Sequence, residues 1–425
     1  MADERTFVIV GASLAGAKAA ETLRSEGFTG RVVLIGAETE RPYERPPLSK
    51  GYLQGKEPRE KAYVHDAAWY SENRVELLPG VRVGVVHPAE HLVGIEDMGP
   101  LPYDKLLLAT GSEVRRLDVP GVDNLGVHCL RTYGHADLLR GELREGARVV
   151  IIGAGWIGME VAAAARGYGC DVTVVARDRL PLRRVLGDEV AQIFADLHRA
   201  NGVEFRYQTK VREFDGAGRR VTHVVLDDAT VLAADLVLMA VGVRPAVELA
   251  ERAGLAIEDG VVTDESLRTS DPDIYACGDV ASFWHPMLGR RIRVEHWSNA
   301  LNGGPAAARA MLGQPVRYDR VPYVFSDQYD LGMEYAGYVP AGPGGYDSVV
   351  FRGDPSVVDG RSPECVAFWL AGDRVLAGMN INVWDVNESI QALVRAGYAG
   401  VGVNVDQLVD PSVPLADLAA TVSSG

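Results

Sequence analysis

Two glycine-rich segments carry residues whose spacing is suited to binding a dinucleotide. Residues 11–16 read GASLAG and residues 153–158 read GAGWIG. In the pattern GxGxxG the first glycine makes a tight turn, the second lets the backbone approach a pyrophosphate, and the third lets the helix pack on its strand. The second copy is complete with Gly153, Gly155 and Gly158, whereas Ser13 stands between Gly11 and Gly16 in the first. One copy is weak evidence, but two copies indicate two nucleotide sites.

The residues that follow each motif distinguish the two nucleotides. Glu38 stands where a carboxylate can accept hydrogen bonds from both hydroxyls of an unphosphorylated adenosine ribose, as FAD requires. At the matching place in the second copy, the run VTVV leads into Ala176 and Arg177. Because an arginine binds a 2′-phosphate that a carboxylate repels, the sequence favours NADPH over NADH. The alternative is a solvated basic face or a partner's docking patch, formed by Arg177 with Arg179, Arg183 and Arg184.

Both motifs sit in the same predicted succession of elements. TFVIV, GASLAG, AKAAETLRSEG and RVVLIGAE read as strand, turn, helix and strand, and residues 148–175 repeat the order. Strand-like runs follow in LPYDKLLLATGS and ADLVLMAVGVRP. A further segment, TSDPDIYACGDVA at 269–281, places Asp279 after a strand, where its carboxylate can bond a ribityl or ribose hydroxyl. From about residue 320 short alternating strands and one helix, near NESIQALVRAG, indicate a separate α+β domain.

These elements predict an α/β protein with two Rossmann-like dinucleotide-binding domains and a C-terminal α+β domain. We expect a discontinuous FAD-binding domain over 1–115 and 246–320. An NAD(P)H-binding domain is expected over 116–245, and a cap over 321–425.

Composition limits the classes of partner. The chain has 425 residues, 47% of them hydrophobic, and a formal net charge of −15 without a long basic tract, so nucleic acid is not expected as the main partner. We expect no signal peptide and no membrane span, and therefore a cytoplasmic protein. The four cysteines lie far apart without a CxxC pair, so neither a disulfide framework nor a metal site is expected: Cys129, Cys170, Cys277 and Cys365.

The ordered set of motifs, together with RPYERPPLSKGYL at 41–53, resembles a known family over essentially the whole chain. It is similar to the FAD-dependent single-chain ferredoxin reductases. That family includes putidaredoxin reductase, rhodocoxin reductase and the reductase components of aromatic dioxygenases, with apoptosis-inducing factor as a distant relative. Disulfide reductases of the same superfamily carry a redox cysteine near 41–53, whereas this chain has no cysteine before Cys129. The resemblance therefore disfavours thiol–disulfide chemistry.

The resemblance implies a set of site residues. Lys50 and Glu160 would form an ion pair at the N5 edge of the flavin, where a cation stabilises the anionic reduced ring. This chain differs from relatives at two positions. Some relatives have an acidic residue where this chain has Ala37, and many have Trp where it has Phe325. The residues expected at FAD are Gly11, Ser13, Ala15, Gly16, Glu38, Arg45, Lys50, Val83, Ala109, Thr110, Gly111, Arg131, Gly278, Asp279 and Trp297. Those expected at NAD(P)H are Gly153, Gly155, Ile157, Gly158, Glu160, Arg177, Arg184, Gly242 and Glu295, with His296 lining the approach.

The implied activity is electron transfer from NAD(P)H through FAD to an acidic [2Fe–2S] or other ferredoxin that serves a cytochrome P450 or an oxygenase. Arg290, Arg291 and Arg293 are expected to form a docking surface for that ferredoxin, or else a solvated charge run. Two other functions stay open. One is an NAD(P)H oxidase or quinone reductase, and the other is a redox-sensing binding protein like apoptosis-inducing factor.

Overall fold

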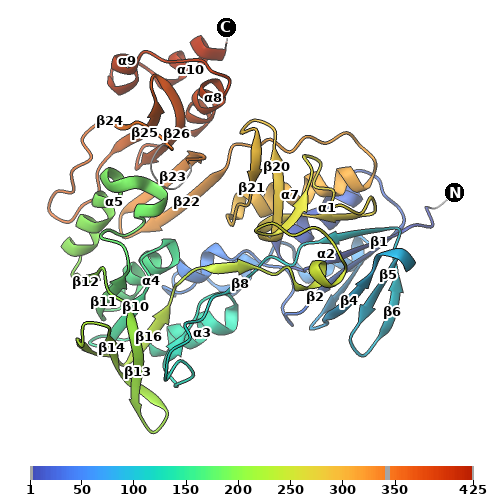
Figure 1. Cartoon of the computed structure of the whole chain (residues 1–425), viewed down its shortest axis with the longest axis horizontal. Coiled ribbons are helices and arrows are strands. Elements are labelled where there is room, and N and C mark those ends of the chain that lie inside the picture. Colours follow the sequence, from blue (N-terminus) through green and yellow to red (C-terminus); the bar gives the residue numbers. More distant parts are fainter. Residues whose placement is uncertain (1–2, 340–344, 424–425) are drawn as a thin grey trace. The chain divides into compact units, whose positions relative to one another are not determined.

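The computed structural model describes residues 3–339 and 345–423. The chain divides into two compact units. Unit 1 consists of Met1–Arg45, Arg59–Glu113 and Arg244–Pro322, and unit 2 of Pro46–Pro58, Val114–Val243 and Tyr323–Gly425. Figure 1 labels the elements of both.

Unit 1 is built on a five-stranded parallel sheet with the order β19-β7-β1-β2-β3. Its inner strands are apolar on both faces, as expected for a covered parallel sheet, and Val8, Ile9 and Val33 are fully buried. The strands are β1 (Thr6–Val10), β2 (Arg31–Gly36), β3 (Val75–Pro79), β7 (Lys105–Leu108) and β19 (Ile274–Ala276).

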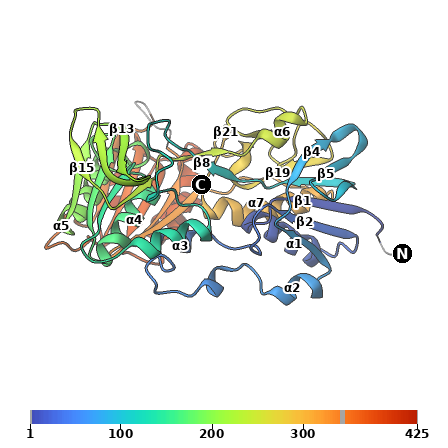
Figure 2. The same cartoon turned by 90° about the horizontal axis from the view of Figure 1, so that it is seen from below.

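Two long helices of unit 1, α1 (Leu14–Ser25) and α7 (Trp297–Met311), pack against each other beside this sheet (Figure 2). Their backbones approach so closely that a Cβ at Gly304 would lie 2.2 Å from the Ala15 carbonyl oxygen. The smaller sheets are β4 (Val83–His87), β5 (Leu92–Ile95) and β6 (Gly99–Pro102), and β18 (Val261–Thr263), β20 (Ala281–His285) and β21 (Arg290–Ile292). The short helices are α2 (Ala67–Glu72), α6 (Glu248–Arg252), η2 (Arg59–Ala62), η3 (Pro88–Glu90) and η4 (Gly278–Val280).

Unit 2 contains a second parallel five-stranded sheet, with the order β12-β11-β10-β16-β9. Its strands are β9 (Val127–His128), β10 (Arg148–Ile152), β11 (Asp171–Ala176), β12 (Val203–Tyr207) and β16 (Leu236–Met239). The helices are α3 (Tyr133–Glu142), α4 (Trp156–Gly167), α5 (Arg183–Ala200) and the 3-10 helix η1 (Pro46–Ser49). A smaller antiparallel sheet of unit 2 joins β13 (Val211–Ala217), β14 (Arg220–Leu226) and β15 (Val231–Ala233). The short strands β8 (Ser112–Val114) and β17 (Val243–Pro245), within which the chain passes from one unit to the other, pair with each other.

The C-terminal part of unit 2, orange to red in Figure 1, is an antiparallel sheet with helices after it. Its helix α8 buries Ile390, Leu393 and Val394 on one face at helical spacing and packs on β26. The sheet order is β22-β23-β26-β25-β24, with β22 (Tyr323–Gln328), β23 (Leu331–Gly337), β24 (Ser348–Arg352), β25 (Cys365–Ala371) and β26 (Arg374–Ile381). The helices are α8 (Asn387–Tyr398), α9 (Val405–Val409) and α10 (Leu415–Ser423).

This sheet shares one hydrophobic core with α4 and α5. Met159 and Phe194 from the helices lie in the same buried cluster as Tyr335 and Trp369 from the sheet. The Trp369 indole also donates a hydrogen bond to the Leu186 carbonyl at 3.1 Å. The predicted mixed α/β fold class is confirmed, and the three-domain boundaries stay a prediction.

Candidate functional site

A buried ion pair joins Lys50 to Glu160 within unit 2. The Lys50 Nζ atom lies 2.6 Å from Glu160 Oε1, and the side chains are 13% and 3% exposed. Lys50 follows η1 directly, and its backbone N–H donates to the Pro47 carbonyl, while Glu160 lies in the second turn of α4. Because each charge would be costly to bury alone, the pair holds both side chains in place.

Hydroxyl groups complete the environment of this carboxylate. Ser49 Oγ donates to Glu160 Oε2 at 2.5 Å, and Ser326 Oγ on β22 donates to Oε1 at 2.7 Å. The Phe325 ring centroid is 5.4 Å from the Lys50 ammonium, within the range of a cation–π contact. Burial raises the pKa of Asp327, although Lys50 acts in the opposite direction. The site therefore holds a cation at a fixed, nearly dry position.

The glycine turn after β1 has the backbone geometry that a dinucleotide requires. Gly11 has φ +121°, and a Cβ there would lie 2.0 Å from the Ala109 carbonyl oxygen. A Cβ at Gly16 would lie 2.0 Å from the Gly11 carbonyl oxygen, so α1 can pack on its strand only with glycine there. Ser13 is the N-cap of α1, but its side chain accepts no hydrogen bond from the N–H groups of the helix, and the first turn holds no acid. The first N–H groups of α1 have no partner within the helix, so this N-terminus is suited to binding a pyrophosphate.

Glu38 lies two residues after β2 and is held by two donors. Tyr43 Oη donates to Glu38 Oε2 at 2.5 Å, and Arg45 Nη2 donates to Oε1 at 2.7 Å. The Glu38 side chain is still 36% exposed. Since a carboxylate has about four acceptor positions, it can also accept from ribose hydroxyls.

Other residues predicted at FAD lie on the same unit. Thr110 Oγ1 donates to the Ala246 carbonyl at 2.8 Å and so serves the local fold. Trp297 begins α7, and its Nε1 donates to Glu44 Oε2 at 3.0 Å. Ala15 lies in α1, Val83 begins β4, Ala109 and Gly111 follow β7, and Gly278 and Asp279 begin η4. Lys50 and Arg131 belong to unit 2.

The second glycine turn has the same geometry as the first. Gly153 has φ +108°, and a Cβ there would lie 2.2 Å from the Ala240 carbonyl oxygen. A Cβ at Gly158 would lie 2.1 Å from the Gly153 carbonyl oxygen, whereas a Cβ at Gly155 would meet no heavy atom within 4 Å. Ile157 is 41% exposed in the first turn of α4, and Gly242 follows β16 with φ +95°. The open space at Gly155 leaves room for the close approach of a pyrophosphate.

The four arginines of segment 177–184 are not equivalent. Arg184 pairs with Asp178 at 2.7 Å. Arg179 and Arg183 both pair with Asp188. Arg177, directly after β11, is exposed, and in the part of the chain that the structure describes it makes no ion pair or hydrogen bond. Arg177 is thus available to bind an anion, whereas the other three arginines of the segment are paired with aspartates.

The predicted ferredoxin-docking surface of Arg290, Arg291 and Arg293 is wrong for two of these residues. Arg291 Nη1 donates to the Thr263 carbonyl at 2.7 Å and also to the Ser282 carbonyl. Arg293 is only 11% exposed and pairs with Glu295 at 2.5 Å and with Asp259 at 3.3 Å. These two guanidinium groups are used inside unit 1, and Arg290 alone of the three is exposed. The same pairing engages Glu295, which was predicted at the nicotinamide.

The hydroxyl groups around Glu160 could not be predicted from the sequence motifs. Ser49 directly precedes Lys50, and Ser326 lies 166 residues from Glu160 in the chain. A weak signal was present, because Ser326 and Gln328 are polar residues that share one face of a strand by their spacing of two. That face is buried, with Ser326 0% and Gln328 1% exposed.

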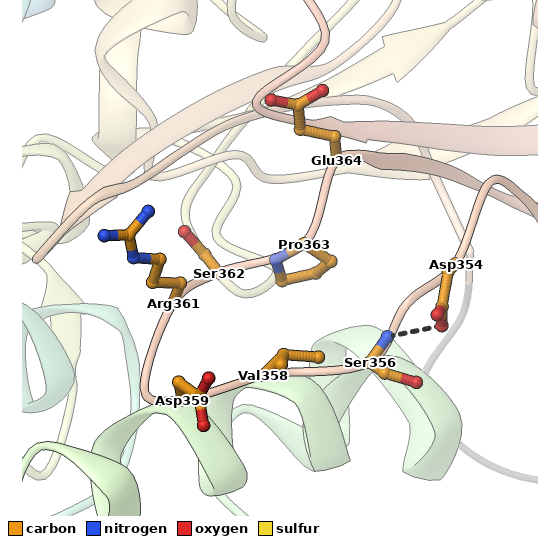
Figure 3. A pocket seen from close by; sticks show the side chains of 8 residues that line it. All are labelled: Asp354, Ser356, Val358, Asp359, Arg361, Ser362, Pro363 and Glu364. Carbon is orange, nitrogen blue, oxygen red and sulfur yellow. Dashed lines mark hydrogen bonds between the residues drawn. The ribbon is translucent and has the colours of Figure 1, made fainter.

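A hollow in the C-terminal part is lined by residues of the loop between β24 and β25 (Figure 3). Its acids include Asp354, Asp359 and Glu364, and it contains none of the predicted site residues.

Within residues 3–339 and 345–423, no group of three or more His, Cys, Asp or Glu side chains is arranged to hold a metal ion. Over the same residues, no helix is long and apolar enough to cross a membrane.

Two family models match the chain. The model described as pyridine nucleotide-disulphide oxidoreductase matches residues 5–304, and the model described as reductase C-terminal matches residues 323–419. The first covers more than half of the chain.

Similar proteins extend over nearly the full length. The ferredoxin–NAD(+) reductase component of the anthranilate 1,2-dioxygenase system of Burkholderia cepacia is 40% identical over 410 residues, which are 96% of this chain and 98% of that protein. Putidaredoxin reductase of Pseudomonas putida is 36% identical over 98% of this chain and 97% of its own. A crystal structure of the covalent putidaredoxin reductase–putidaredoxin complex matches with a TM-score of 0.92 and 35% identity, covering 99% of each chain.

Proposed function

The chain belongs to the pyridine nucleotide-disulphide oxidoreductase family, and on this premise we propose that it is an NAD(P)H-dependent ferredoxin reductase. The cofactors that the family implies are FAD and NAD(P)H. We further propose that the ferredoxin serves a cytochrome P450 or an oxygenase, in the cytoplasm. The names of the similar proteins, a dioxygenase reductase component and putidaredoxin reductase, support this assignment.

One observation carries the proposal: segment 41–53 presents an amine where thiol–disulfide chemistry needs a thiol. The chain has no cysteine before Cys129. Instead, Lys50 of this segment is paired with Glu160 at 2.6 Å and is mostly buried. Burial also raises the pKa of Cys277 to about 12, so that thiol is a poor nucleophile at neutral pH. The site is therefore suited to electron transfer without a protein disulfide.

The residues of the chain supply orientation and charge. FAD, when bound, takes up two electrons as a hydride from the nicotinamide and releases them singly. Lys50 would supply the cation that stabilises negative charge on the reduced flavin, and Glu160 holds that cation in place. Gly153, Gly155 and Gly158 leave room for the coenzyme pyrophosphate at the start of α4. No side chain has to act as a general acid or base.

For the coenzyme we propose a preference for NADPH. The support is that Ala176 and Arg177 stand where a ribose-binding acid is expected, and that Arg177 is exposed and uncommitted within the described residues. The names of similar proteins lean toward the other coenzyme, because three dioxygenase reductases are named for NAD(+) and one ferredoxin reductase, of Sphingomonas, is named for NAD(P)(+).

The proposed activity is tested by steady-state oxidation of NADPH under air, with and without a [2Fe–2S] ferredoxin. We expect slow turnover alone and much faster turnover with ferredoxin, followed by the loss of NADPH absorbance, because oxygen reoxidises the reduced ferredoxin and lets it turn over. Rapid consumption of oxygen or quinone without a protein acceptor would instead support an oxidase or quinone reductase. A long-lived reduced complex whose oligomeric state changes, by size-exclusion chromatography, would support a redox-sensing binding protein.

A further inference from the structure

A line of hydrogen-bonded polar side chains, most of them buried, leads from Glu160 through unit 2 to Tyr329. Ser326 Oγ lies 2.7 Å from Glu160 Oε1, and Gln328 Nε2 lies 3.0 Å from Ser326 Oγ. Gln328 Oε1 lies 2.8 Å from His198 Nε2, and Tyr329 Oη lies 3.2 Å from His198 Nδ1. His198, on α5, is 0% exposed. Since buried polar groups are costly unless they are paired, a continuous line of this kind points to a role beyond filling the core.

The anionic end sets the direction of every hydrogen bond. Glu160, paired with Lys50, can only accept, so Ser326 donates its hydroxyl proton. The Ser326 oxygen then accepts from the Gln328 amide N–H, which leaves Gln328 Oε1 as an acceptor. His198 must therefore donate through Nε2–H.

The phenol end is consistent with this tautomer. With its proton on Nε2, His198 has an acceptor at Nδ1, where Tyr329 Oη donates. Burial raises the pKa of Tyr329, which keeps its hydroxyl protonated, and burial lowers the pKa of His198 to about 4, which keeps the ring neutral.

The backbone conformation at Tyr329 is unfavourable for a large side chain, which indicates that the tyrosine is needed at this position. The residue has φ +58°, in the left-handed region that disfavours side chains larger than glycine. It lies in the turn between Gln328 and Leu331, which are opposite each other in the β22–β23 hairpin. A glycine there would relieve the backbone but would lose the hydroxyl contact with His198.

We propose that Tyr329, His198, Gln328 and Ser326 form a one-way hydrogen-bond relay that positions the Glu160 carboxylate for its pairing with Lys50. The four are positioning residues, because they act on the site through Glu160. The relay connects α5 and β22 to the ion pair, so the C-terminal part of the chain contributes to the site through Ser326 and Gln328. The link to flavin reduction rests on the proposed function, whereas the tautomer of His198 does not.

The first test is the tautomer of His198, measured by ¹⁵N NMR of the histidine-labelled full chain, with the signal assigned by its loss in His198→Gln. We expect a neutral ring with the proton on Nε2, and a shift of the Nδ1 signal in Tyr329→Phe. A proton on Nδ1, or a Nδ1 signal that Tyr329→Phe leaves unchanged, would overturn the relay whatever the electron acceptor is.

The second test compares His198→Leu with His198→Gln in stopped-flow flavin reduction by NADPH. The glutamine side chain can still donate to Gln328, whereas leucine cannot. We expect roughly 3- to 10-fold slower reduction in His198→Leu, the loss equivalent to one broken hydrogen bond, and recovery of most of the rate in His198→Gln. Equal rates in both variants would contradict the relay.

A matched control and a milder variant keep this test decisive. Gln192→Leu removes an exposed hydrogen bond to Asp196 on the same helix, and we expect it to leave the rate unchanged. If His198→Leu does not fold, Tyr329→Phe replaces it, since this change removes one hydroxyl and preserves the ring. A rate in Tyr329→Phe equal to that of Gln192→Leu would then overturn the proposal.

Discussion

At the scale of single residues, the central feature is a charge pair that has both a structural and a chemical role. Glu160 is 3% exposed and accepts from Lys50, Ser49 and Ser326. A buried pair of this kind contributes little net stability, but removing one partner leaves an unpaired charge. The two roles can therefore be separated by removing one partner or both.

Lys50→Met should destabilise unit 2 by about 3 kcal/mol, because it leaves the Glu160 carboxylate buried without its cation. The double variant Lys50→Met/Glu160→Met should regain most of that stability. Both should reduce the rate of flavin reduction by roughly 10- to 100-fold, since the positive charge is gone in each. Urea unfolding and stopped-flow absorbance measure the two effects. A double variant with normal flavin reduction would show that the pair is purely structural.

We expect one residue, Arg177, to have the largest effect on the proposed coenzyme preference. Arg177→Ala should lower kcat/KM for NADPH by roughly 10- to 100-fold, the effect of losing a charged hydrogen bond to phosphate, and should change the NADH value little. The matched control is Arg179→Ala, because Arg179 is exposed in the same segment but pairs with Asp188. If wild-type enzyme uses NADH much faster and Arg177→Ala changes neither coenzyme, the phosphate-binding role is wrong.

At the scale of elements, the two glycine turns are the part of the site that could be predicted from the sequence. Strand, turn and helix follow from local residue types, so both parallel sheets and the glycine geometry could be predicted. Ser326 and His198 could not, because the contacts of Ser326 with Glu160 and of His198 with Gln328 form through tertiary packing between segments far apart in the chain. The arginine docking surface failed for a similar reason. Nothing in GRRIRVEHW shows that Arg291 and Arg293 bind carbonyls and acids within unit 1.

Two glycines of the second turn should respond differently to the same added methyl group. Gly158→Ala should destabilise the chain, because its Cβ would lie 2.1 Å from the Gly153 carbonyl oxygen. Gly155→Ala should fold normally, since that Cβ would meet no heavy atom within 4 Å, yet it should weaken NADPH binding by filling the space for the pyrophosphate. Thermal unfolding and coenzyme titration distinguish the two. Normal NADPH affinity in Gly155→Ala would contradict the placement of the pyrophosphate.

At the scale of the whole molecule, the α/β class and the change of pattern near residue 320 could be read from the sequence. The sequence could not predict that the C-terminal sheet shares a core with α4 and α5, because the residues of that core, such as Phe194 and Trp369, look like ordinary apolar positions in isolation.

The chain carries a net charge of −15, so an acidic ferredoxin would be repelled at long range. Its association should therefore become faster, or at least no slower, as salt is added at low ionic strength.

The most direct test of electron transfer to a ferredoxin is an anaerobic sequential-mixing experiment. The protein is first reduced with one equivalent of NADPH and then mixed with an oxidised [2Fe–2S] ferredoxin, while the flavin and iron–sulfur absorbances are recorded. We predict that the flavin is reoxidised as the ferredoxin is reduced, with two ferredoxins reduced per NADPH and a rate that rises with ferredoxin concentration. A flavin that stays reduced in the presence of ferredoxin, but is rapidly reoxidised by oxygen or quinone, would contradict it.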